Sequence, residues 1–161
     1  MALCLVVAVL IPWHSLLKHK LNLTRSSPMR ISNIYITPTD EWLVTEVPSS
    51  INLNYEKKLI RISIIKAKGK AALEPFIKYM SSKNIIFSKI KCKVGNKNLD
   101  GIQSEDRHNN VIYNNLTIAF DKDTLISVSY SREDNDANAK IVESFLSNNI
   151  KIVTNLDEEK L

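Results

Sequence analysis

Short segments in which apolar, often β-branched residues alternate with polar ones constrain the fold of this chain more than any other feature. Such alternation is typical of antiparallel strands with one buried face. The acidic turn between the last two of these segments predicts a hairpin. The clearest segments are Leu59–Ala67, Ile86–Val94, Val111–Phe120 and Leu125–Tyr130. In the second of them, Ile86 and Val94 are expected to face inward, with the intervening lysines facing solvent.

Four weaker segments add to the predicted strands, and two others have helical spacing. The weaker strands are Ile31–Ile36, Trp42–Val47, Leu99–Ser104 and Ile150–Val153. The predicted helices are Ala71–Lys83, which tolerates Pro75 if the helix begins near Glu74, and Ala137–Asn148, with Asp134 or Asp136 as its N-cap.

These elements predict an α+β fold: an antiparallel sheet of about six or seven strands with two helices packed against it, preceded by an N-terminal apolar segment. The length of 161 residues fits one domain. The expected division is residues 1–17 as an apolar leader or membrane anchor, 18–30 as a basic linker, 31–156 as the single domain and 157–161 as a charged tail.

The N-terminal run Ala2–Ile11 consists of ten apolar residues, which is the length of a secretory signal core. No basic residue precedes the run, and no small-x-small cleavage site follows it. An export leader, an uncleaved anchor, a buried N-terminal element and a misassigned start therefore all stay open. The first two predict a protein of the periplasm or one anchored in the inner membrane.

Charge is distributed in two blocks of opposite sign. Residues 57–97 contain twelve basic residues and one acid, whereas residues 98–138 contain eight acids and three basic residues. This distribution suits a protein partner of complementary charge, and solvated lysines on the outer faces of strands would produce it as well. Phe76, Tyr79 and Phe87 are expected in the core rather than on a base-stacking platform, so we expect no nucleic-acid binding.

The residue types that support catalysis or metal binding are not arranged in recognisable motifs. Of the three histidines only His108 lies in the domain, in a predicted polar loop at 106–110. The acidic segment 134–138 resembles the start of a calcium loop, but Ala139 and Phe145 occupy the positions that need Gly and Glu. Cys4 and Cys92 are not expected to pair. The sequence thus predicts no enzyme, no cofactor and no metal.

The order of elements resembles the PsbP-like/DcrB-like domains from about Ile31 to Val153. The resemblance rests on Asp40–Trp42, on Val47 followed by a proline, on a long β-branched strand, a helix and a meander containing Gly101, and on the closing helix Asp136–Phe145. It implies a small binding module without shared catalytic residues. Members include envelope lipoproteins, chaperones for secreted effectors and immunity proteins.

The sequence leads to the hypothesis of a non-enzymatic bacterial envelope protein that binds another protein, in the first place an immunity protein neutralising a secreted toxin. The alternative is a membrane-tethered solute- or lipid-binding domain with a pocket between sheet and helices. The candidate partner-binding residues are Lys89, Lys91, Lys93, Glu105, Asp106, Glu133, Asp134 and Asp136.

Overall fold

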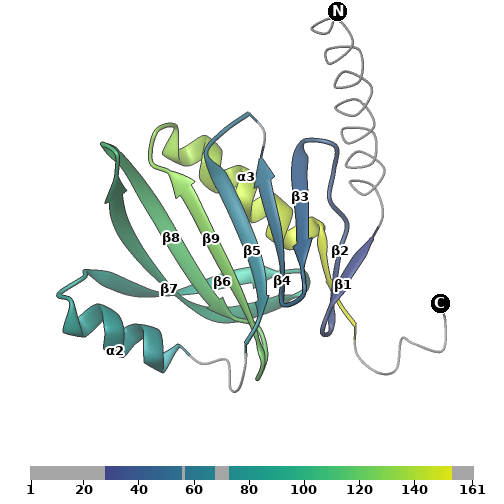
Figure 1. The fold of residues 1–161 in the computed structure, drawn as a ribbon, viewed down its shortest axis with the longest axis horizontal. Coiled ribbons are helices and arrows are strands. Elements are labelled where there is room, and N and C mark those ends of the chain that lie inside the picture. Colours follow the sequence, from purple (N-terminus) through teal and green to yellow (C-terminus); the bar gives the residue numbers. More distant parts are fainter. Residues whose placement is uncertain (1–27, 56, 68–72, 154–161) are drawn as a thin grey trace, which may run out of the picture.

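The computed structural model describes residues 28–55, 57–67 and 73–153. These residues form an α+β fold with a seven-stranded sheet, a separate three-stranded sheet and two helices (Figure 1). The predicted leader, most of the basic linker and the charged tail lie outside the described residues. Within those described ranges, no helix is both long enough and apolar enough to cross a membrane.

The main sheet is antiparallel throughout, as the alternating segments predict. Its strand order is β3-β4-β5-β9-β8-β7-β6, so β3 and β6 are its edge strands. The strands are β3 (Trp42–Val47), β4 (Ser50–Tyr55), β5 (Ile60–Lys66), β6 (Phe87–Val94), β7 (Lys97–His108), β8 (Val111–Ala119) and β9 (Thr124–Ser131).

The second sheet joins the two ends of the domain. It consists of β1 (Met29–Ile31), β2 (Ile34–Ile36) and β10 (Ile150–Ile152), with β2 in the centre. The sequence predicted one strand across Ile31–Ile36 and one sheet. The chain instead reverses at Ser32, which has a φ of 53°, and therefore forms a hairpin that pairs with β10 apart from the main sheet.

Helix α3 (Asn135–Asn148) covers one face of the main sheet and lies behind it in Figure 1. Val142, Phe145 and Leu146 on this helix are buried. The Trp42 ring lies against Phe145 with 4.4 Å between centroids, so this tryptophan packs under the helix. The core of the domain is thus formed between α3, the small sheet and the face of the main sheet that α3 covers.

Helix α2 (Glu74–Ser82) forms where the sequence predicts a helix, and it begins next to Pro75 as expected. None of its residues is buried. In Figure 1 it lies at one corner of the molecule, far from α3. Only Leu73, Ile77 and Met80 on its apolar side are even half-buried.

Three further expectations are wrong. Strand β4 was not predicted, although Ile51 and Leu53 are fully buried in the core. Ile86 was expected to face inward, but it precedes β6 and is 90% exposed. The predicted loop at 106–110 is the end of β7 plus a tight two-residue turn, in which Asn109 and Asn110 both have positive φ.

The face of the main sheet that points away from α3 is called the distal face here. Successive side chains of a strand point to opposite faces of the sheet, so the residues of the distal face are those that alternate with the core residues along each strand. Small polar residues predominate on the central strands of this face, among them Ser63, Ser127 and Thr117, which are half-buried. Two apolar residues of the face, Ile102 and Leu125, are buried.

Candidate functional site

A hollow of about 940 Å³ lies at one end of the distal face, where the β4–β5 turn approaches the ends of β7 and β9. Its volume is in the range of pockets that hold small ligands. The lining combines nitrogen bases, hydroxyl groups and apolar side chains, and it contains no carboxylate. The lining residues are Leu43, Asn54, Tyr55, Lys58, Leu59, Ile60, Arg61, His108, Tyr113 and Ser129.

Arg61 is held in place across the sheet. Its Nε donates a hydrogen bond to Asn54 Oδ1 on β4 over 3.0 Å. Two positions further along the same two strands, on the same face of the sheet, Ser63 Oγ donates to Asn52 Oδ1 over 2.7 Å. A guanidinium has five N–H donors, so the bond to Asn54 fixes the group while using one of them.

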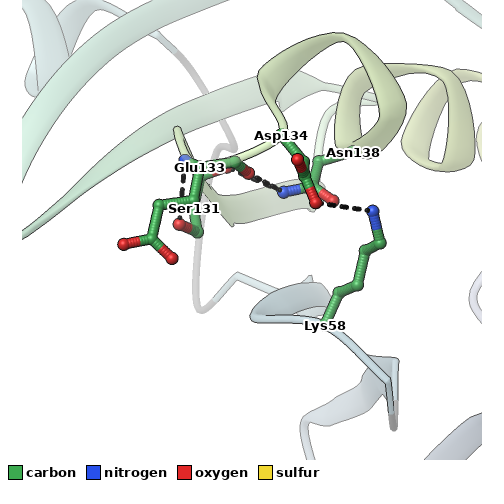
Figure 2. A network of polar contacts seen from close by, with 5 residues as sticks. All are labelled: Lys58, Ser131, Glu133, Asp134 and Asn138. Atoms are coloured by element: carbon green, nitrogen blue, oxygen red, sulfur yellow. Dashed lines mark hydrogen bonds and ion pairs between the residues drawn. The ribbon is translucent and has the colours of Figure 1, made fainter.

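A network of polar contacts holds the junction between β9 and α3, and through Lys58 this network reaches the lining of the hollow (Figure 2). Asn138, which is 2% exposed, donates from Nδ2 to the carbonyl oxygens of Ser131 and Glu133 over 2.9 and 2.7 Å. The Glu133 N–H donates to Ser131 Oγ over 3.1 Å. These bonds hold the backbone at the point where the strand turns into the helix.

Asp134 occupies the N-cap position of α3, as predicted, but its carboxylate makes no capping hydrogen bond. The residue has a φ of 54°, in the left-handed region. Its Oδ2 lies 3.4 Å from Lys58 Nζ on the β4–β5 turn. The carboxylate therefore links the helix start to the rim of the hollow instead of capping the helix.

The two acidic segments predicted as partner-binding come together at this end. Glu105 on β7 pairs with Arg132, which directly precedes Glu133, with 3.0 Å between Glu105 Oε1 and Arg132 Nη1. We call the exposed carboxylates here the acidic end. They are Glu105, Asp106, Glu133, Asp134 and Asp136.

The three predicted lysines lie elsewhere, on the distal face of edge strand β6. We call Lys89, Lys91 and Lys93 the lysine row; all three are exposed. Lys91 Nζ lies 2.7 Å from Asp100 Oδ1 on the neighbouring strand. The structure therefore does not combine the basic and acidic candidates into one site.

The potential metal ligands of the described residues are not grouped. Among the described residues, no three His, Cys, Asp or Glu side chains are grouped closely enough to hold a metal ion. His108 lines the hollow from the end of β7, not from a loop. Cys92 is a half-buried free thiol whose pKa is raised by burial and, to a smaller extent, by the Glu143 charge.

A smaller recess of about 310 Å³ lies at the other side of the sheet, between α3 and the start of β3. Trp42, Ile141 and Phe145 form its apolar part. Burial, followed by a hydrogen bond with Glu41, raises the pKa of Tyr55, which borders both this recess and the hollow. The larger of the two cavities is thus on the distal face, and the smaller one lies between the sheet and a helix, where the alternative hypothesis places a pocket.

The sequence did not single out Arg61, Tyr113 or Ser129 as site residues. They come from β5, β8 and β9, which meet only through the strand order of the folded sheet. Their one signal in the sequence is a polar residue at an outward position of a strand, which is also the commonest kind of surface residue.

Comparisons with known proteins bear on the fold alone. No protein-family model matches the chain, and no curated protein matches its sequence. The structure is similar to a crystal structure of a protein from Bacteroides thetaiotaomicron VPI-5482, with a TM-score of 0.51 and 11% sequence identity. The match covers 81% of this chain but 50% of that protein, so the chain spans half the length of its structural neighbour. The class that the structure defines is a small α+β domain with a seven-stranded antiparallel sheet.

Proposed function

We propose that this chain is a non-enzymatic domain that binds another protein through the acidic end and the hollow beside it. The observation that carries the proposal is the meeting of two acidic segments through the pair Glu105 and Arg132, which are 27 positions apart in the sequence. Asp134 of the second segment also pairs with Lys58, which lines the large cavity. A cavity next to a charged rim provides both a place for an anchoring side chain and a means of steering its approach.

The partner's contact surface is basic, with a polar or aromatic side chain that enters the hollow. Basic groups on the partner face Glu133 and Asp136, both of which are exposed. The entering side chain meets the Tyr113 and His108 rings and the Ser129 hydroxyl. Opposite charges across such a rim mainly raise the association rate, and the filled cavity slows dissociation.

Within this class we favour an immunity protein of the bacterial cell envelope that neutralises a secreted toxin. The resemblance to PsbP-like/DcrB-like domains and the apolar N-terminal run support this proposal. Neutralisation by binding needs no chemistry from the immunity protein.

The test is co-expression of the chain with the toxin-like protein encoded beside its gene. We expect the wild-type chain to protect cells and to bind the toxin in vitro. The double variant Glu133→Lys/Asp136→Lys is expected to lose at least about tenfold in affinity, with a slower association rate. Glu46→Lys/Glu143→Lys makes the same change of charge elsewhere on the surface and should bind normally. Absence of both protection and binding by the wild-type chain would overturn the proposal.

A solute-binding domain is the second candidate, and the volume of the hollow favours it. Native mass spectrometry of the freshly purified chain would detect a co-purified small molecule. Ser129→Trp places a large ring in the hollow and is expected to abolish such retention. A ligand that stays bound in this variant would have to occupy the recess beside Trp42 instead.

A further inference from the structure

Helix α2 and the residues that follow it expose three large apolar side chains close together in the sequence. Phe76 is 36% exposed, Tyr79 is 58% exposed and Ile86 is 90% exposed. Phe76 and Tyr79 were expected in the core, and their exposure shows that this prediction is wrong. Large apolar side chains grouped on a surface commonly mark an interaction site.

Phe76, Tyr79 and a lysine, Lys83, share one flank of the helix. Residues 76, 79 and 83 follow the i, i+3, i+7 spacing that places side chains on the same side of a helix. The half-buried residues Leu73, Ile77 and Met80 form the neighbouring side, toward the protein. Phe76, Tyr79 and Lys83 therefore point along the surface and away from the core.

The charge of this region is strongly positive. Residues 73–97 contain six lysines, no arginine and one acid, Glu74. Lys91 is the one among these lysines that pairs with a carboxylate in the part of the chain that the structure describes. The lysine row follows α2 closely along the chain, because only residues 83–86 separate the helix from β6.

We propose that α2 and β6 form a surface that binds anionic phospholipid membranes. We call it the α2–β6 surface; it consists of Phe76, Tyr79, Lys83, Ile86, Lys89, Lys91 and Lys93. The apolar side chains enter the boundary between headgroups and acyl chains, and the lysines lie among the lipid phosphates. This surface is separate from the acidic end, so the proposal goes beyond the proposed function and does not depend on it.

The composition of the surface favours a membrane over other polyanions. Ile86 is aliphatic and almost fully exposed, and it has no flat face on which a base can stack. Arginine, whose planar fork suits the recognition of nucleic acids and carboxylates, is absent from residues 73–97. Lysines next to exposed apolar and aromatic side chains are what an anionic lipid surface attracts.

The first experiment measures sedimentation of the full chain with vesicles of phosphatidylcholine, alone or mixed equally with phosphatidylglycerol. The apolar run at residues 2–11 is expected to bind lipid by itself, so the comparison is between variants of equal charge. Lys83→Glu/Lys89→Glu should lose at least about 30-fold in affinity for the mixed vesicles. Lys140→Glu/Lys151→Glu, on α3 and β10, should lose less than about threefold. Equal losses in the two variants, or no loss in the first, would overturn the proposal.

The second experiment locates the contact directly. Ile86→Trp in a Trp13→Phe background places a fluorescent side chain on the α2–β6 surface, while Trp42 is buried in the core. Brominated phosphatidylglycerol vesicles should shift its emission to the blue and quench it. Unchanged emission in the presence of these vesicles would contradict the proposal.

The same variants decide between polyanions. A mixed-sequence single-stranded DNA oligonucleotide is the probe for nucleic acid. If Lys83→Glu/Lys89→Glu weakens binding to this oligonucleotide and leaves vesicle binding intact, the surface binds nucleic acid and the proposal is wrong. Glu133→Lys/Asp136→Lys should leave vesicle binding undiminished, which separates this surface from the acidic end.

Discussion

The two helices of this domain have similar amphipathic sequences and very different environments. Helix α3 buries four residues, whereas helix α2 buries none. Helix α3 follows β9, a central strand, and lies across the core face where Trp42 meets it. Helix α2 connects β5 to the edge strand β6 and lies at a corner. The spacing of apolar residues thus predicts a helix and its apolar side, but the position in the sheet decides whether that side is buried.

The largest expected contrast comes from removing one aromatic ring from each helix. Phe145→Ala leaves a cavity next to Trp42 and should lower the free energy of unfolding by about 3–5 kcal/mol. Phe76→Ala on α2 should lower it by less than about 1 kcal/mol, because that ring is already partly in water. Urea denaturation followed by circular dichroism measures both values. Similar losses would show that α2 contributes to the core as α3 does.

A smaller effect on the free energy of unfolding is expected from removing the Asn138 side chain, which holds the start of α3 by hydrogen bonds. Asn138→Ala removes two hydrogen bonds to backbone carbonyl oxygens and should cost about 1–3 kcal/mol in unfolding free energy. Asn148→Ala, at the exposed end of the same helix, should change that free energy by less than about 0.5 kcal/mol. If the two variants are equally stable, the β9–α3 junction does not depend on the Asn138 side chain.

The Glu143 carboxylate on α3 affects the pKa of Cys92 on strand β6. Burial and the Glu143 carboxylate raise the pKa of Cys92, so the folded state favours the neutral thiol. Stability from this group is fully present below the ordinary thiol pKa of about 8.5 and is lost as pH rises through the higher folded value. In a Cys4→Ser background, Glu143→Gln should move the pH profile of thiol alkylation toward lower pH. An unchanged profile would leave burial as the sole cause.

The smallest effect is expected on the exposed flank of α2. Tyr79→Ser should change the free energy of unfolding by less than about 0.5 kcal/mol, as surface substitutions usually do. Differential scanning calorimetry would detect a larger loss. A loss of about 2 kcal/mol would mean that the flank packs against protein and is not free to contact a membrane.

Strands in which apolar and polar residues alternate clearly could be predicted from the sequence. A strand whose solvent-facing positions hold residues that are uncommon in strands could not. Strands β5, β6, β8 and β9 lie within one or two residues of their expected bounds. Strand β4 was missed because Asn52 and Asn54, residues that are uncommon in strands, occupy its outer positions. In the structure they accept hydrogen bonds from Ser63 and Arg61 on β5, a compensation that only the folded sheet provides.

The candidate site was predicted in part. The acidic and basic candidates could be chosen from charge alone, and Glu105 and Glu133 do lie at one end. The hollow could not be predicted, since Arg61, Tyr113 and Ser129 approach one another only through the order of β5, β9 and β8. Long-range strand order is not encoded in local spacing.

The small sheet has a consequence for how the protein is made. Its central strand β2 pairs with β10, so residues near position 35 cannot complete their pairing until residues near position 151 have been synthesised. On a translating ribosome the hairpin of β1 and β2 emerges early, with Ile34 and Ile36 still unburied by their final partners. The small sheet therefore forms only after β10 has been synthesised, and a chain interrupted after α3 would display an open strand to chaperones and proteases.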